Sequence, residues 1–566
     1  MNGFVRSWPK RGKSKTEYRR QKTEDRRQKT EDRIQKTEDR KQKTKDRRQN
    51  TEYRRQNTED RIQKTEEGKR RLFYFLPALC ISCREMLTLI NTNMMTPAVG
   101  PIGLDYIAGA VSKAGIKVDT VDLCLVDEPL KSLQGYFATN SPQLVGISFR
   151  NVDDCFWPSA EWFVPKLADS ISTIRKMTDA PIVIGGVGFS IFAERIVEYT
   201  GADFGIRGDG EGAIVSLLDD LDGARGFERV DGLIWRGDGE IFSNRPAWPS
   251  PLSLPSSRDA IDNQAYFKRG GQCGLETKRG CNRECVYCAD PLAKGTQIRL
   301  RAPSEVADEA EALLARGIDV LHLCDSEFNI PRSHAYAVCE EFNRRSLGGR
   351  LRWYTYMAVV PFDAELAEAM SKAGCVGIDF TGDAGCPSML NIYRQRHLKE
   401  DLESAVRLCR ANGMRVMVDL LLGGPGETRE TVTETIDFIK QINPDCAGAP
   451  LGVRVYPGTE MARIVAAEGA AETNPNIHRK YGGAVDFFKP TFYISASLGE
   501  RPGGLVQDLI AGDKRFFGPM EEVQLETSEG TMSSDHNYND NERLVQAVSA
   551  GARGAYWDIL RELRGS

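Results

Sequence analysis

The sequence predicts an α/β protein with two consecutive domains of parallel strands and a small α+β region after them. Three observations lead to this fold class. Short apolar runs alternate with amphipathic stretches from Met86 to about Asp231, a stretch rich in Pro and Ser follows at 245–257, and six further strand–helix units come after it. The expected parts are a Rossmann-like domain at 86–244, a linker at 245–272, a partial (β/α)6 barrel at 273–460 and the α+β region at 461–566.

The first 85 residues are expected to be a polar tail without a core. A seven-residue unit such as DRRQKTE is repeated seven times from Tyr18 to Glu66, and only Ile34 and Ile62 interrupt its polar pattern. A coiled coil needs two apolar positions in each heptad, so we expect a disordered or transiently helical segment, and we attribute it to upstream repetitive sequence read in frame. The apolar run at 72–82 is too short to cross a bilayer as a helix, and no membrane span is predicted.

The charge of the chain is split between this tail and the rest. Residues 1–71 hold 26 of the 76 Lys and Arg but only 13 of the 80 Asp and Glu, which leaves 50 basic and 67 acidic residues in the remainder. A body this acidic is a poor binder of polyanions, so nucleic acid is excluded as a partner. The 14 cysteines form no dense disulfide framework and no secretory signal opens the chain, so we expect a cytoplasmic protein.

The Rossmann-like domain is expected to begin at Met86. Its buried strands are predicted at 87–91, 117–123, 144–149 and 180–186, with a helix at 104–115 between the first two. Ligands of such sheets bind at the carboxyl ends of the strands, where this chain has NTNMMTPAVGPIG, SFRNVDD, GGVGFS and, further on, RGDGEG. Small residues there allow a ligand close to the backbone, although Gly and Asn also simply make turns. No G-x-G-x-x-G follows the first strand, which disfavours an ordinary dinucleotide site.

The second domain is expected to be a parallel sheet curved into a partial barrel. Strands are predicted at 274–280, 319–328, 352–360, 375–382, 415–424 and 451–458, and helices at 305–317, 364–374, 400–413 and 430–442. The chemistry of such a barrel belongs at the carboxyl ends of its strands.

Three cysteines follow the first of these strands, in the stretch RGCNRECVYCAD. Cys281, Cys285 and Cys288 have C-x3-C-x2-C spacing, with Tyr287 before the last cysteine. Three thiolates on one loop suit an iron–sulfur cluster with one open iron, or zinc if a fourth ligand such as Cys273 or His322 joins them. Three unligated thiols are the remaining alternative.

The spacing and its position resemble the radical S-adenosylmethionine superfamily. The resemblance implies that the three cysteines are catalytic and hold a [4Fe–4S] cluster, whose open iron chelates S-adenosylmethionine for cleavage to a 5′-deoxyadenosyl radical. Further features follow in family order: CDSEFN, GIDFTGD, LLLGGPGET and VYPGTEM. By this resemblance the residues that contact S-adenosylmethionine are Tyr287, Asp325, Glu327, Asp379, Thr381, Gly423, Gly424 and Gly426. Relatives usually have Gly-Ile-Glu-Ser where this chain has GIDF, so Thr381 or Asp383 is expected to replace the ribose contact.

The front domain, joined to such a barrel, resembles the cobalamin-binding class of these enzymes. The cobalamin contacts implied by the resemblance are Asn93, Pro97, Pro101, Gly103, Ser148, Arg150, Asn151, Gly185, Gly186, Gly188 and Glu211. The Asp-x-His-x-x-Gly loop that ligates cobalt in some members is absent, and all five histidines lie at 322 or beyond. We therefore expect cobalamin to be bound without a histidine ligand.

Two turns, SFRNVDDC and HLCDSEFN, are most similar to those of the tryptophan C2 methyltransferase group. That resemblance implies an arginine, here Arg150, under the cobalt, although an arginine at a strand end is also often a plain salt-bridge partner. It further implies a methyltransferase acting through methylcobalamin on an unactivated carbon of a small metabolite or peptide, with an electron donor such as flavodoxin or ferredoxin. The alternatives are cobalamin-dependent oxidation, cyclisation or rearrangement, and a non-catalytic protein that binds a corrin or a cluster.

The region at 461–566 is expected to lie on the substrate side of the barrel. An amphipathic helix with a polar start at Asn541 is predicted near the end of the chain. The aromatic residues Phe487, Tyr493, Phe516 and Tyr538 are candidates for a substrate pocket, although aromatic residues more often belong to a core.

Overall fold

A computed structural model describes residues 86–221, 226–255, 257–519 and 537–565, which belong to one compact unit, Cys83–Ser566. The polar tail at 1–85 lies outside the described residues, and its prediction remains open. Within the part of the chain that the structure describes, no helix combines the length and the apolar character needed to cross a membrane.

The front domain is built on a seven-stranded sheet in the order β2-β1-β3-β4-β5-β6-β7. The first five strands are parallel: β1 (Met86–Asn91), β2 (Lys117–Asp122), β3 (Leu144–Ser148), β4 (Ile182–Gly185) and β5 (Phe204–Ile206). An antiparallel hairpin, β6 (Leu233–Gly237) and β7 (Glu240–Ser243), extends one edge. The four predicted strands are confirmed, but β2 was expected to be buried and instead lies at the edge of the sheet, where it is only partly buried.

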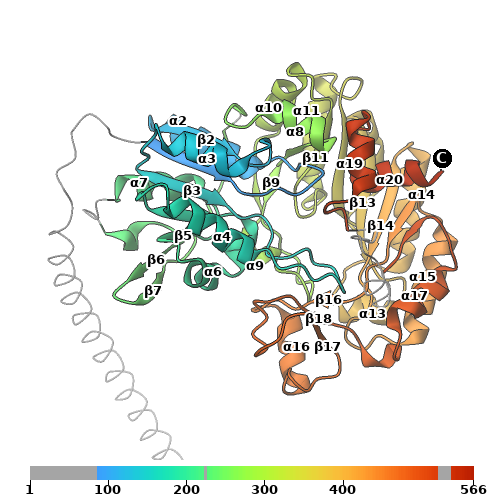
Figure 1. Ribbon diagram of the computed structural model, residues 1–566. Coiled ribbons are helices and arrows are strands. Elements are labelled where there is room, and N and C mark those ends of the chain that lie inside the picture. Colours follow the sequence, from blue (N-terminus) through green and yellow to red (C-terminus); the bar gives the residue numbers. More distant parts are fainter. Residues whose placement is uncertain (1–85, 222–225, 256, 520–536, 566) are drawn as a thin grey trace, which may run out of the picture. The chain divides into compact units, whose positions relative to one another are not determined.

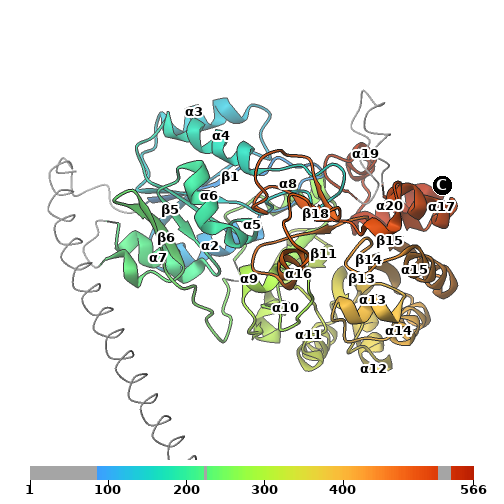
Figure 2. The same cartoon turned by 90° about the horizontal axis from the view of Figure 1, so that it is seen from below.

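Helices cover both faces of this sheet, as Figure 2 shows. One face packs against α2 (Ile102–Lys113) and α7 (Glu211–Asp219), and the other against α3 (Pro129–Phe137), α4 (Val164–Arg175) and α6 (Ala193–Thr200). The short helix α5 (Val187–Ile191) follows β4 directly. This doubly wound arrangement brings the ends of β1, β3 and β4 to one edge of the sheet.

The predicted linker at 245–272 is packed into the protein. It contains α8 (Asn263–Gly270), and its Arg258 is almost fully buried between Asp105 of α2 and Glu309 of α10 (Pro303–Ala315), at 2.7 and 2.9 Å. Buried charges are stable only when they are paired and hydrogen-bonded. This pair of contacts therefore joins the front domain to the barrel.

The barrel sheet has the order β19-β15-β14-β13-β12-β11-β8 and is parallel throughout (Figure 1). Its strands are β8 (Cys273–Leu275), β11 (Val320–Leu323), β12 (Arg352–Ala358), β13 (Cys375–Asp383), β14 (Arg415–Leu420), β15 (Cys446–Gly448) and β19 (Phe516–Phe517). The helices of its outer layer include α10, α11 (Arg332–Arg344), α12 (Ala364–Lys372), α14 (Lys399–Ala411), α15 (Arg429–Ile442) and α17 (Pro502–Ile510). Two shorter helices, α9 (Asp290–Lys294) and α13 (Pro387–Ile392), follow β9 and β13 along the chain.

The predicted sixth strand at 451–458 was wrong. The sixth barrel strand is β15, and the later apolar run forms β16 (Val453–Arg454), which joins β17 (Ile477–Arg479) and β18 (Thr491–Tyr493) in a separate antiparallel sheet next to α16 (Glu460–Glu468). The sheet is extended beyond β15 by β19, from the C-terminal region.

Two C-terminal helices, α19 (Glu542–Ser549) and α20 (Tyr556–Gly565), stand where a single helix was predicted. The expected polar start is confirmed, because the Asn541 side chain accepts a hydrogen bond from the backbone amide of Leu544. Leu544 and Trp557 pack against Tyr354 and Met417, from the amino-terminal halves of β12 and β14. The two helices thus fill the barrel at the end opposite to its carboxyl edge.

Candidate active site

The three cysteines lie on one loop whose ends are held together. Lys278–Arg279 (β9) pairs with Arg299–Leu300 (β10), and the amide of Cys281 donates a hydrogen bond of 3.1 Å to the carbonyl oxygen of Gly295. Gly280 has φ +89°, and an added Cβ would lie 2.1 Å from the carbonyl oxygen of Gln297, so only glycine fits there. The local fold therefore keeps the three thiols in one short enclosed segment.

Burial raises the pKa of all three thiols, for Cys285 to about 12, and their negative charges also act on one another. None of the three forms a disulfide. Thiols that resist ionisation on their own become good ligands when a cation compensates their charge. Three such donors fit an iron–sulfur cluster.

The structure does not provide a fourth ligand for a zinc site from Cys273, the other cysteine near in sequence. Cys273 instead contacts Arg258 and Asn263. Among the described residues, no three His, Cys, Asp or Glu side chains are placed to hold a single metal ion.

Tyr287 belongs to a hydrogen-bonded group beside Cys285. Its hydroxyl donates to Asp383, at 2.6 Å, and the amide of Gln395 donates to both Asp383 and the sulfur of Cys285, at 3.4 Å from the latter. Burial raises the pKa of Asp383 to about 6. Gln395 was missed in the sequence because it follows no motif; its role depends on the turn after α13.

The two acidic residues of the CDSEFN turn have different surroundings. Asp325 accepts hydrogen bonds from the amide of Thr277 at 2.8 Å, from the hydroxyl of Thr277 at 2.5 Å and from the amide of Lys278 at 3.2 Å, so both its oxygens are occupied. Glu327 accepts only from the Thr381 hydroxyl, at 3.1 Å, and its second oxygen has no hydrogen-bond partner. Burial raises the pKa of Glu327 to about 8, and its charge in turn raises the pKa of Cys281 and Cys285. Glu327 therefore lies near the cysteines with a free acceptor.

The glycine-rich turn after β14 is held by a residue that the sequence analysis did not single out. The carboxylate of Glu427 accepts hydrogen bonds from the amides of Gly423 and Gly424, at 2.5 and 3.2 Å. Gly423 and Gly426 have φ +94° and +76°, and a Cβ on Gly424 would lie 2.2 Å from the Tyr393 hydroxyl. The turn thus requires its glycines. Glu427, which fixes the turn, is the last residue of the GGPGE motif.

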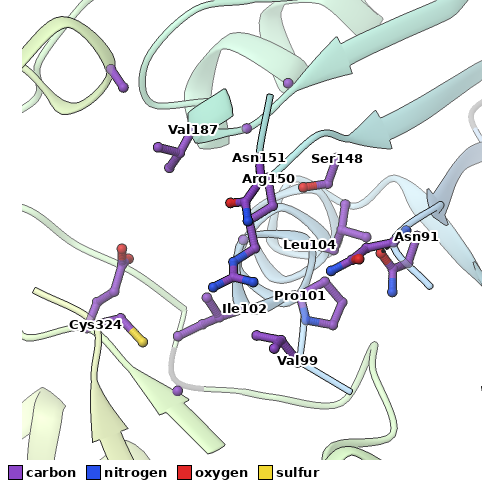
Figure 3. Close-up of a pocket in the computed structure, with 18 of the residues that line it drawn as sticks. Asn91, Val99, Pro101, Ile102, Leu104, Ser148, Arg150, Asn151, Val187 and Cys324 are labelled. Carbon is purple, nitrogen blue, oxygen red and sulfur yellow. Dashed lines mark hydrogen bonds between the residues drawn. The ribbon is translucent and has the colours of Figure 1, made fainter. Parts of the chain in front are cut away.

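A cavity of about 720 Å³ opens where the front domain meets the barrel (Figure 3). Ten of the predicted cobalamin contacts line it: Asn93, Pro97, Pro101, Gly103, Ser148, Arg150, Asn151, Gly185, Gly186 and Glu211. A Cβ on Gly103 would meet nothing within 4 Å, so the wall has room for a large ligand against the backbone. A cavity of this size, with many small residues at strand ends, fits a corrin.

Arg150 points into this cavity, toward the loop that carries Pro101 and Ile102, with Cys324 of the barrel opposite (Figure 3). Burial lowers the pKa of His322 and raises that of Cys324, and the charge of the Arg150 guanidinium is close enough to act on both, in each case toward a lower pKa. The eleventh predicted contact, Gly188, is not in the cavity wall; its amide instead donates a hydrogen bond of 2.8 Å to the Arg150 carbonyl oxygen. Gly188 therefore positions the Arg150 loop.

Glu211 lines the cavity, but its charge is compensated. Arg279 of β9 lies 2.8 Å from its carboxylate and keeps the pKa of Glu211 below its usual range, although burial alone would raise that pKa. Asp209 also forms an ion pair, with Arg299, although burial raises the pKa of Asp209. These contacts bind the front domain to the cysteine loop.

The barrel contributes residues to the cavity that the sequence analysis did not predict, among them His322, Tyr356, Tyr556 and Trp557. The ring centroids of His322 and Tyr356 are 4.9 Å apart. Of the four aromatic pocket candidates, only Tyr538 lies in the cavity wall; Phe516 and Tyr493 are buried in cores, and Phe487 packs beside Tyr493. A histidine thus reaches the cavity from the barrel even though the front domain has none.

Comparisons with known proteins agree with this geometry. The radical SAM superfamily matches residues 275–439, and the B12 binding domain matches residues 95–218. Tryptophan 2-C-methyltransferase of Streptomyces laurentii is 30% identical over 579 residues, which cover 84% of this chain and 96% of the relative. The chain is also similar to two solved structures of the radical S-adenosylmethionine methyltransferase TsrM from Kitasatospora setae. One has tryptophan and an S-adenosylmethionine analogue bound (TM-score 0.78, 31% identity, 85% of this chain and 99% of the other). The other has cobalamin and a [4Fe-4S] cluster bound (TM-score 0.75, 28% identity, 85% and 98%).

Proposed function

Because the chain belongs to the cobalamin-dependent radical S-adenosylmethionine methyltransferases, we propose that it transfers a methyl group to a ring carbon of tryptophan or of a closely related indole. The cavity at the domain junction is the observation that carries this proposal. Its barrel side is lined by aromatic side chains, Tyr356, Tyr538, Tyr556 and Trp557, which suit a flat aromatic substrate.

The cofactors of this family are a [4Fe–4S] cluster, S-adenosylmethionine and cobalamin. When bound, the cluster supplies an electron, S-adenosylmethionine supplies the methyl group, and cobalamin carries that group. We assign the cluster to Cys281, Cys285 and Cys288, and cobalamin to the cavity wall around Arg150. For S-adenosylmethionine, Glu327 is a better candidate than Asp325, because Glu327 has a free acceptor oxygen.

The protein's own side chains position the reactants and exclude water. Gln395 donates a hydrogen bond to a cysteine ligand, and Glu427 fixes the glycine-rich turn that we assign to the adenine edge. A guanidinium has no lone pair to donate, so Arg150 beside bound cobalamin would contact the cofactor without ligating its cobalt. Apolar side chains of the C-terminal helices α19 and α20 pack against Tyr354 and Met417 of the barrel.

An electron donor is required by the cluster, and we propose a flavodoxin or a ferredoxin in the cytoplasm. Reduced thiols support this compartment, since none of the cysteines that the structure describes is in a disulfide.

Product analysis tests the proposed function. The full chain, reconstituted without oxygen, is incubated with tryptophan and S-adenosylmethionine carrying a ¹³C methyl group. We expect S-adenosylhomocysteine and a ¹³C-methylated indole in equal amounts. Formation of 5′-deoxyadenosine without a methylated product would indicate oxidation or rearrangement instead, and the absence of all three products with tryptophan and related indoles would contradict the proposal.

A further inference from the structure

Lys278 is a buried cation to which the proposed function gives no role. It belongs to β9, just before the cysteine motif, and is only 2% exposed. Within the part of the chain that the structure describes, its ammonium group forms neither an ion pair nor a hydrogen bond. Other buried charges are paired, as Arg258 is with Asp105. Because a buried charge without a counter-ion is costly, Lys278 needs an anion that none of the described residues supplies.

The side chain of Lys278 points away from the cavity at the domain junction. The next residue, Arg279, lines that cavity and pairs with Glu211. Successive side chains of a strand point to opposite faces, and Lys278 is not among the residues that line the cavity. Its backbone amide donates a hydrogen bond of 3.2 Å to Asp325, which fixes the base of the side chain. The fold thus directs this lysine to a different place from the cobalamin wall.

The ammonium group of Lys278 lies on the side of the cysteine loop. Burial raises the pKa of Cys281 and of Glu327, and the charge of Lys278 acts on both toward a lower pKa. Asp290, another carboxylate near Lys278, is already paired with Lys294 at 3.0 Å. A positive charge without a partner therefore stands close to the thiols to which we assign the cluster.

We propose that Lys278 supplies a counter-charge to the iron–sulfur cluster and thereby raises its reduction potential. Three thiolates make the bound cluster anionic, and the electron taken from the reduced donor protein adds a further negative charge. A fixed ammonium group stabilises the reduced cluster more than the oxidised one, because the attraction grows with the charge of the cluster. Net charge is one of the factors that set the potential of such clusters.

An ammonium group has donors and no lone pair, so Lys278 acts beside the cluster and not as a ligand of iron. This inference rests on the assignment of the cluster to the three cysteines, and the identity of the methyl acceptor does not enter it.

A redox titration of the full chain, reconstituted without oxygen, tests this role. Lys278→Met removes the charge but keeps the length of the side chain, and Lys278→Arg keeps the charge. Lys372→Met is the matched control, because Lys372 is exposed on α12 and pairs with Glu368. Electron paramagnetic resonance follows the reduced cluster as the potential is lowered, and the iron content is measured in parallel.

We expect every variant to hold about four irons. In Lys278→Met the ratio of reduced to oxidised cluster at a given potential should fall roughly tenfold, which for one electron is a shift of about 59 mV to a more negative midpoint potential. Lys278→Arg and Lys372→Met should shift much less.

Several results would overturn the inference. One is an unchanged potential in Lys278→Met with its iron complete, and another is an equal shift in Lys372→Met, which would indicate the overall charge of the protein. Binding of S-adenosylmethionine to the oxidised protein covers a different anion: weaker binding with an unchanged potential would assign Lys278 to the carboxylate of that ligand.

If Lys278→Met loses its iron, the arginine variant decides. Complete iron and an unchanged potential in Lys278→Arg would support a role of the charge, and loss of iron from this variant as well would contradict it. The potential is measured without a methyl acceptor. A protein that does not methylate tryptophan would therefore contradict the proposed reaction and leave this role of Lys278 intact.

Discussion

The amide of Gly188 and the carbonyl oxygen of Arg150 are joined by a hydrogen bond of 2.8 Å. This bond connects α5 to the turn after β3, and an added Cβ on Gly188 would lie 2.8 Å from the same oxygen. The direction of Arg150 into the cavity therefore depends on a residue that does not line the cavity itself.

Gly188→Ala is expected to weaken cobalamin binding at least tenfold, because the backbone of Arg150 must move to admit the methyl group. A stability loss of about 1–3 kcal/mol is expected as well, as in other overpacked cores. Absorbance titration with cobalamin and urea unfolding measure the two effects. Gly135→Ala, in α3 with nothing within 4 Å of its Cβ, is the control and should bind normally. Equal cobalamin affinity in both variants would contradict this role for Gly188.

Arg150 is expected to act on cobalt without ligating it. Arg150→Lys should bind cobalamin but slow methyl transfer, and Arg150→His should add a nitrogen splitting to the electron paramagnetic resonance signal of the reduced cofactor. The unmodified enzyme should show no such splitting. His322 supplies the internal control, because it also lines the cavity. A splitting in the unmodified enzyme that disappears in His322→Phe would identify a histidine ligand and contradict the expectation.

Cys285→Ala should abolish the cluster. The unmodified protein is expected to hold about four irons and four sulfides, with the broad visible absorbance of a [4Fe–4S] centre. Cys155→Ala is the control, since that cysteine is exposed and contacts Tyr456. A full complement of iron in the Cys285 variant would refute the ligand assignment, and stoichiometric zinc in the unmodified protein would favour a structural metal site.

Because of His322, we expect the free energy of unfolding to be lower in mild acid than at neutral pH. Burial lowers its pKa from 6.5 to about 4, so the folded protein holds the neutral form. Its contribution to stability is complete above pH 6.5 and is lost as the pH falls toward 4, because the unfolded chain takes up the proton first. Between pH 7.5 and 5.5 this amounts to about 1 kcal/mol. Urea unfolding should show that His322→Phe loses less stability over this interval; an equal loss would mean that His322 does not resist protonation.

The sequence predicted the long strands well and the short ones badly. The strands β1 to β4 and β11 to β14 have four to nine residues, and they overlap the segments where the pattern placed them. The sixth barrel strand, Cys446–Gly448, is a three-residue segment of small side chains, and β19 has two residues far along the chain. Neither produces an apolar run, whereas 451–458 does and belongs to another sheet. This part of the sheet depends on the pairing of β15 with β19, which are more than sixty residues apart, so a local sequence pattern cannot predict it.

Part of the barrel interior was nevertheless visible in the sequence. His322 in VLHL and Asp419 in VMVDL each interrupt an otherwise apolar run, and His322 lines the cavity. Such interruptions in a parallel strand are a usable signal for an inward-facing group. Gln395, Glu427 and Tyr538 could not be assigned to the site in this way, because they come from turns and from a distant segment.

The late position of β19, α19 and α20 has a consequence for synthesis. A chain still emerging from the ribosome can complete the front domain and the cysteine loop while β15 remains an open sheet edge and the barrel interior remains exposed to water. Unpaired edges and exposed apolar interiors are where nascent chains aggregate. A stop codon between the cysteine motif and Phe516 would therefore leave Cys281, Cys285 and Cys288 in place and still yield a product prone to aggregate.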